Sequence, residues 1–180
     1  MNLPNKLTLM RVILVPVFMV FLILPITRFH LFIALFIFII ASLTDLVDGK
    51  LARRNNQVTD FGKLMDPLAD KLLVTAALIG FVQLHLGDAW IAMIVLAREL
   101  LVTSLRLIAV NSKGTVIPAN IWGKVKTNSQ MAAIIIALFL GGLGVSYIYG
   151  YICLWVAAAF TVVSGIQYTW SYRSLISTTK

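Results

Sequence analysis

Charged side chains are scarce in this sequence, and their scarcity excludes an ordinary soluble domain. Only 12% of the 180 residues are Asp, Glu, Lys or Arg, whereas a soluble domain of this length carries about twice that fraction. The single cysteine, Cys153, excludes an internal disulfide. The sequence also lacks internal repeats and low-complexity linkers, so we expect one domain over residues 1–180.

Apolar residues make up 60% of the chain and lie in long blocks. Four segments contain no Asp, Glu, Lys or Arg: residues 12–27, 29–44, 72–87 and 127–172. Because a membrane-spanning helix needs about 20 mostly apolar residues, these blocks predict helices over 7–25, 31–53, 62–86, 88–110, 122–141 and 146–170. We therefore expect an all-α, polytopic membrane protein with six transmembrane helices and a short N-terminal interfacial segment.

The basic residues predict the orientation of these helices. With both termini in the cytoplasm, 14 of the 15 Lys and Arg residues fall on the cytoplasmic side and only Arg28 faces outward. This asymmetry follows the positive-inside rule, and it predicts a multi-pass membrane protein whose acidic cluster lies on the cytoplasmic side. We expect its location to be the cell inner membrane. The net charge of +8 indicates binding to anionic lipid and phosphorylated substrates rather than to nucleic acid, because no soluble basic domain is present.

Four of the seven acidic residues are clustered: Asp45, Asp48, Asp66 and Asp70. On helices, spacings of three and four residues put each pair on one face. Four carboxylates would repel one another unless they bound cations. Oxygen ligands favour hard ions such as Mg²⁺, Mn²⁺ or Ca²⁺, and paired ions suit a phosphoryl displacement. The cluster predicts a cytoplasmic divalent-metal site; the alternative is a set of solvated surface charges paired with nearby Lys and Arg.

The residues around these carboxylates suit a nucleotide. Gly49 lets a phosphate or a base approach the backbone closely, and the small Ala52 keeps the region uncrowded. Arg53 carries a planar donor group that matches phosphate. Gly62 permits close helix packing where the carboxylates would converge.

The whole pattern, Asp45-x2-Asp48-Gly49-x2-Ala52-Arg53-x8-Gly62-x3-Asp66-x3-Asp70, resembles the signature of the CDP-alcohol phosphotransferase family. The resemblance implies a homodimeric, six-helix membrane enzyme that displaces CMP from a CDP-linked lipid with two Mg²⁺ or Mn²⁺ ions. It implies that Asp45, Asp48, Asp66 and Asp70 bind the metal and that Asp70 is the general base. It also implies nucleotide binding by Asp48, Gly49, Ala52, Arg53 and Gly62.

The first residues of the chain extend this resemblance. The opening Pro4-Asn5-x-Leu7-Thr8-x-x-Arg11 is similar to one common in the same family. The resemblance implies that Asn5 and Thr8 help to line the cytidine pocket. The alternative is ordinary anchoring of the chain at the membrane surface.

Basic residues on the fourth and fifth predicted helices are further candidates for binding an anion. Arg98, Glu99 and Arg106 share one broad helix face, and a structural ion pair between Glu99 and Arg106 is the simpler explanation for those two. Lys124, Lys126 and Thr127 open the next helix, where free N–H groups favour a phosphate. Lysines at a cytoplasmic helix end are otherwise ordinary topology signals.

Together these two segments resemble the phosphatidylglycerolphosphate synthase branch of the family. This resemblance implies transfer from CDP-diacylglycerol to sn-glycerol 3-phosphate. The acceptor phosphate would be bound by Arg98, Arg106, Lys124, Lys126 and Thr127. The alternatives are a different acceptor (inositol phosphate, serine or phosphatidylglycerol), an intramembrane prenyltransferase, and a divalent metal transporter.

Overall fold

The structure is a computed structural model, and it describes residues 3–54, 60–113 and 121–173. Side chains are described for residues 8–44, 68–69, 71–109 and 121–173. All secondary structure in these ranges is helical. The all-α prediction is therefore confirmed.

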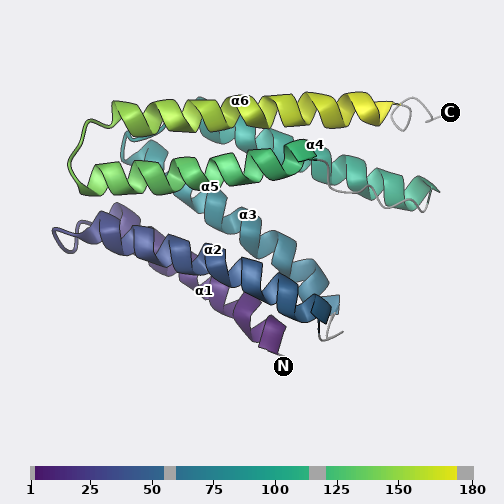
Figure 1. Ribbon diagram of the computed structural model, residues 1–180, viewed down its shortest axis with the longest axis horizontal. Helices are drawn as coiled ribbons and strands as arrows, with labels where there is room; N and C mark the ends of the chain where they lie inside the picture. The colour runs from purple at the N-terminus through teal and green to yellow at the C-terminus, as the bar shows by residue number, and fades with distance from the viewer. Residues whose placement is uncertain (1–2, 55–59, 114–120, 174–180) are drawn as a thin grey trace.

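The described residues form six helices, which follow one another along the chain (Figure 1). Their bounds are α1 Leu3–Ile23, α2 His30–Arg54, α3 Asp60–Gln83, α4 Ala89–Lys113, α5 Ile121–Gly142 and α6 Ile148–Ser171. The helix α1 begins four residues earlier than predicted, so the opening segment is already helical. Pro4 is tolerated there because N–H groups in the first turn of a helix have no intrahelical partner. The predicted break between the last two helices is confirmed, since α5 ends at Gly142 and α6 begins at Ile148. Gly144 adopts a left-handed φ of 69° in this connection.

The helices run back and forth along one long axis. In Figure 1 the pair α5 and α6 lies above the pair α1 and α2, and α3 runs diagonally behind them. The two pairs meet directly where α2 packs against α5. The connections over residues 24–29, 84–88 and 143–147 lie at one end of the molecule. The start of α1, the end of α2, the start of α3 and the end of α4 point toward the other end. This alternation places the segments that carry the predicted site residues at a common end.

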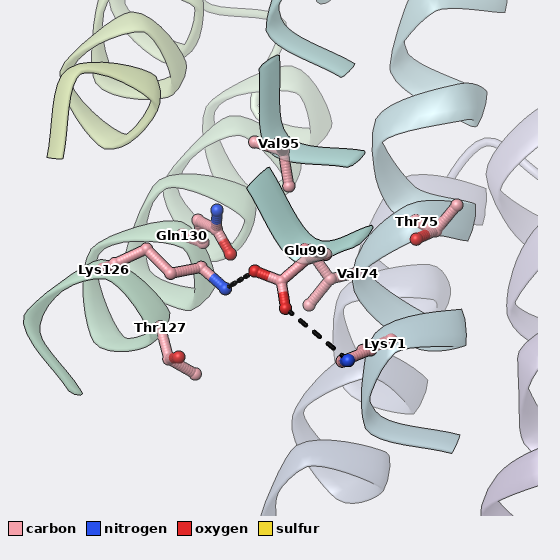
Figure 2. A pocket seen from close by; sticks show the side chains of 8 residues that line it. All are labelled: Lys71, Val74, Thr75, Val95, Glu99, Lys126, Thr127 and Gln130. Atoms are coloured by element: carbon pink, nitrogen blue, oxygen red, sulfur yellow. Dashed lines mark hydrogen bonds and ion pairs between the residues drawn. The ribbon is translucent and has the colours of Figure 1, made fainter. Parts of the chain in front are cut away.

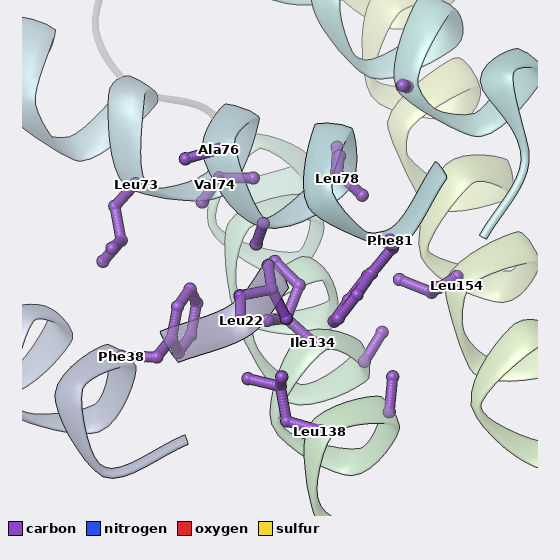
Figure 3. Close-up of a cluster of buried hydrophobic side chains, with 14 of the residues drawn as sticks. Leu22, Phe38, Leu73, Val74, Ala76, Leu78, Phe81, Ile134, Leu138 and Leu154 are labelled. Atoms are coloured by element: carbon purple, nitrogen blue, oxygen red, sulfur yellow. The ribbon is translucent and has the colours of Figure 1, made fainter. Parts of the chain in front are cut away.

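A cluster of buried apolar side chains joins α1, α2 and α3 to α5 and α6 (Figure 3). It includes Phe18, Leu22, Phe38, Phe81, Ile134, Leu138 and Leu154. Small residues let helix backbones approach closely in membrane proteins, and the packing of α6 on α5 follows this rule. A Cβ atom at Gly150 of α6 would lie only 3.0 Å from the Cα atom of Ala137 on α5.

In the part of the chain that the structure describes, α5 and α6 are long and apolar enough by length and composition to cross a membrane. Within the described residues, α1, α2 and α3 contribute the shorter apolar stretches Thr8–Ile23, His30–Thr44 and Lys71–Gln83. Large apolar side chains cover much of the outside, among them Trp90, Leu100 and Trp170, each 69% exposed. Such an exposed apolar surface suits contact with lipid.

Candidate active site

The four clustered aspartates occupy two consecutive helices. Asp45 and Asp48 lie in the last part of α2, and Asp66 and Asp70 lie in the first part of α3. Both segments are helical, as the predicted spacing requires. Figure 1 shows these helix ends at the same end of the molecule as the start of α1, which carries Asn5 and Thr8.

Most of the predicted metal and nucleotide residues have side chains outside the described residues. These residues are Asn5, Asp45, Asp48, Gly49, Ala52, Arg53, Gly62, Asp66 and Asp70. Among the described side chains, no group of three His, Cys, Asp or Glu could hold a metal ion. Thr8 is described, and it is buried, with 1% of its surface exposed. Four carboxylates on two neighbouring helix ends are a set of oxygen donors that fits two hard divalent cations. The metal site and the nucleotide site stay predictions.

A cavity of about 460 Å³ opens between α3, α4, α5 and α6. It is lined by Lys71, Arg98, Glu99, Arg106, Gly123, Lys124, Lys126, Thr127, Asn128 and Tyr168. Five of these side chains are cationic and one is a carboxylate. The excess of positive charge, in a hollow between helices, suits an anionic ligand.

The arginines on α4 are held by residues of α6. Arg98 donates from Nη2 to the Ser164 hydroxyl at 2.6 Å. Arg106 donates from Nη2 to the Tyr168 hydroxyl at 3.0 Å. The guanidinium carbons of both arginines lie 5.5 Å from the centroid of the Tyr168 ring, a distance at which a cation is attracted to an aromatic face. Both guanidinium groups therefore have defined positions at the cavity wall.

Glu99 connects three helices around the cavity (Figure 2). Its Oε1 accepts a hydrogen bond from Lys126 of α5, which Figure 2 shows. The same oxygen accepts a hydrogen bond from Nη1 of Arg98 at 3.1 Å. Its Oε2 lies 4.0 Å from Nζ of Lys71 on α3. The alternative ion pair between Glu99 and Arg106 is wrong, because Arg106 instead contacts α6. Glu99 thereby holds Lys126 and Arg98 at one edge of the cavity.

Lys71 links this cavity to the segment that carries the clustered aspartates. Its Nζ donates to the Thr103 hydroxyl of α4 at 2.6 Å. It directly follows Asp70 in α3. The cavity wall therefore reaches the backbone turn that presents the predicted general base.

The start of α5 forms the remaining wall. Lys124 is exposed, while the side chain of Lys126 is only 7% exposed. The Thr127 hydroxyl donates to the Gly123 carbonyl at 3.0 Å, within its own helix. The structure thus brings all five residues predicted for the acceptor phosphate to one cavity: Arg98, Arg106, Lys124, Lys126 and Thr127.

The sequence prediction missed several lining residues. Lys71 could have been predicted from the sequence, because it is a cation directly beside the acidic cluster. Tyr168 gave no comparable signal, since it is one aromatic residue within a long apolar helix. Gly123 and Asn128 flank the basic motif that opens α5, and only the helix packing shows that they reach the cavity.

Comparison with known proteins agrees with the family resemblance of the aspartate motif. A family model for CDP-alcohol phosphatidyltransferases matches residues 1–163. A protein of Bacillus subtilis (strain 168) is 48% identical over 182 residues, with 93% of each chain covered, and is named CDP-diacylglycerol--glycerol-3-phosphate 3-phosphatidyltransferase. Proteins with the same name from Haemophilus influenzae and Rickettsia bellii are 42% and 40% identical. The matches cover 93% of this chain in both cases, and 91% and 93% of the respective relatives.

Proposed function

The chain belongs to the CDP-alcohol phosphatidyltransferase family, and we propose that it makes phosphatidylglycerol phosphate and CMP from CDP-diacylglycerol and sn-glycerol 3-phosphate. Membership of this family removes the prenyltransferase and the metal transporter from the alternatives. The choice of acceptor is supported by the names of relatives 40% to 48% identical to this chain.

One structural observation carries the proposal: a cationic cavity adjoins the helix turn that bears Asp70. Five cationic side chains line that cavity, and one of them, Lys71, is the next residue after Asp70. A phosphate dianion is the ligand that such a site favours. An acceptor bound there by its phosphate would have its far hydroxyl near α3. Serine, which has no phosphate group, would offer no dianion to this cluster of cations.

In the proposed reaction, Asp70 accepts the proton of the glycerol C1 hydroxyl. The hydroxyl oxygen forms a bond to the phosphorus that carries the diacylglycerol. The bond from that phosphorus to the bridging oxygen of the pyrophosphate breaks, and CMP leaves with that oxygen. Arg98, Arg106, Lys124, Lys126 and Thr127 hold the acceptor phosphate during this exchange.

The donor side of the site belongs to α1, α2 and α3. We propose that Asn5, Thr8, Asp48, Gly49, Ala52, Arg53 and Gly62 bind the nucleotide. Asp45, Asp48, Asp66 and Asp70 would hold two Mg²⁺ or Mn²⁺ ions. Bound there, the ions would supply positive charge that neutralises the phosphate oxygens and the leaving group.

The membrane setting follows from the charge distribution. We propose a six-span, single-domain protein of the inner membrane whose active site faces the cytoplasm, where its water-soluble acceptor is found. The lipid tails of the donor would lie between helices in the bilayer. A homodimer is the proposed assembly.

The test is CMP release by the purified, full-length protein in detergent with CDP-diacylglycerol and Mg²⁺ or Mn²⁺. Glycerol 3-phosphate is run beside inositol phosphate, serine and phosphatidylglycerol. We expect CMP release that depends on the metal and that occurs with glycerol 3-phosphate but with none of the other three acceptors. Release with a different acceptor would overturn the assignment of the cationic cavity. A folded protein that released no CMP with any acceptor would overturn the reaction itself.

A further inference from the structure

Glu99 is the one carboxylate among the described residues that line a cavity for an anion. Its hydrogen bonds to cations use only Oε1, while Oε2 is in an ion pair with Lys71. Oε1 accepts from Lys126 and Arg98, whereas Oε2 lies 4.0 Å from the Lys71 ammonium, beyond hydrogen-bond length. Within the described part of the chain, no donor forms a hydrogen bond with Oε2, and the side chain is 17% exposed. Oε2 therefore keeps the capacity to accept a hydrogen bond, and Glu99 lines the cavity in which a ligand would lie.

Glu99 lies where the central carbon of the proposed acceptor would lie, between the residues that would bind its phosphate and the turn that bears Asp70. On one side lie Lys126 and Arg98, which belong to the cationic wall. On the other side lies Lys71, the residue after Asp70. Glycerol 3-phosphate has its phosphate at one end, its reacting hydroxyl at the other, and a second hydroxyl on the carbon between them.

We infer that Oε2 of Glu99 accepts a hydrogen bond from the C2 hydroxyl of the acceptor, which makes Glu99 a specificity-determining residue. The inference rests on the proposed function. A site built to bond a hydroxyl rejects the analogue that lacks it, because a polar group is left unpaired. A carboxylate acceptor makes this bond about twice as strong as a neutral one.

Two other roles for this carboxylate predict different behaviour. If Glu99 only held Lys126 and Arg98 in place, its loss would impair every phosphorylated acceptor by the same factor. If it only repelled the phosphate, its loss would tighten the binding of every acceptor. Only if Glu99 binds the C2 hydroxyl does the effect of replacing Glu99 depend on whether the acceptor has that hydroxyl.

The experiment compares glycerol 3-phosphate with 3-hydroxypropyl phosphate, which lacks only the C2 hydroxyl. CMP release by the full-length protein gives kcat/KM for each. We expect the parent to favour glycerol 3-phosphate by about tenfold or more, the usual effect of one charge-assisted hydrogen bond. Glu99→Gln should reduce that preference to about threefold or less, mainly by lowering kcat/KM for glycerol 3-phosphate. Asp88→Asn, the same change at the opposite end of the molecule, should keep the parent's preference.

Each outcome decides between the possibilities. A parent that uses both acceptors equally overturns the inference without any variant. A Glu99→Gln protein that loses the same factor with both acceptors also overturns it, and assigns the carboxylate to holding the cations. Glu99→Asp, which keeps the charge, should retain part of the preference. A folded parent that releases no CMP with glycerol 3-phosphate overturns the proposed function, whereas release without preference overturns only this inference.

Discussion

Arg106 of α4 and Tyr168 of α6 meet at the wall of the cationic cavity through both a hydrogen bond and a ring contact. The hydrogen bond from Nη2 to the hydroxyl is 3.0 Å long, and the guanidinium carbon lies 5.5 Å from the ring centroid. Tyr168 is only 2% exposed, so the surrounding packing fixes its position. The same ring also lies 5.5 Å from the guanidinium carbon of Arg98. One buried aromatic residue therefore orients two cations.

Tyr168→Phe should raise KM for glycerol 3-phosphate about three- to tenfold with kcat little changed. The substitution removes the hydrogen bond with Arg106, worth about 1 kcal/mol, and keeps the ring. Tyr168→Leu should have a larger effect, because the contact with both arginines is lost as well. The measurement is CMP release at varied acceptor concentration, with Tyr172→Phe as the control, since Tyr172 stacks on Tyr168 but does not line the cavity. An unchanged KM in folded Tyr168→Phe would contradict the role of the hydroxyl.

Arg106→Ala should raise KM for the acceptor by about tenfold or more, because a charge-assisted bond to phosphate is removed. Arg106→Lys should recover only part of this loss, since an ammonium lacks the two-pronged geometry of a guanidinium. Arg28→Ala is the matched control, because Arg28 lies in the connection between α1 and α2, away from the cavity. The same steady-state assay measures all three. If KM for the acceptor did not change in Arg106→Ala, this residue would not bind the phosphate.

Asp70→Asn and Asp66→Asn should each abolish turnover without unfolding the protein. For Asp70 the proposed loss is that of a general base, which contributes about 10²- to 10⁴-fold. For Asp66 it is the loss of a metal ligand. CMP release measures activity, and circular dichroism with size-exclusion chromatography checks the fold. Substantial activity in folded Asp70→Asn would rule out this residue as the base.

Ala137→Leu should destabilise the protein by about 1–3 kcal/mol, the usual cost of overpacking. Ala137 is 5% exposed and faces Gly150 across the tight contact between α5 and α6. Ile136→Leu is the control on the same helix, at a side chain that is 39% exposed. The midpoint of thermal unfolding in detergent should fall for Ala137→Leu only. Equal midpoints for the two variants would mean that the contact tolerates a larger side chain.

The acidic cluster and the helices could be predicted because their signals are local. Asp45 and Asp48 share a helix face whenever that segment is helical, and so do Asp66 and Asp70. Long apolar blocks predict helices whatever the neighbouring segments do. The motif residues Arg98, Arg106, Lys124 and Lys126 were predicted as one site by resemblance alone. The structure places them at one cavity.

The partners of these residues could not be predicted. Glu99 and Arg106 share a helix face, which made an ion pair between them plausible. The packing of α4 against α5 and α6 instead gives Glu99 to Lys126 and Arg106 to Tyr168. The sequence offers more than one possible partner for each of these charged side chains, and sequence spacing does not show which partner is chosen.

By itself, the sequence determined the helical class, the helix bounds to within a few residues, and the spacing of the four aspartates. These depend on the period of the helix and on the length of apolar blocks. Only the tertiary structure decided that Lys71, Glu99 and Tyr168 complete the cationic cavity. The contacts that bring the cavity together join residues 27, 32, 62 and 66 positions apart. Contacts at such separations depend on how whole helices cross, which no local pattern specifies.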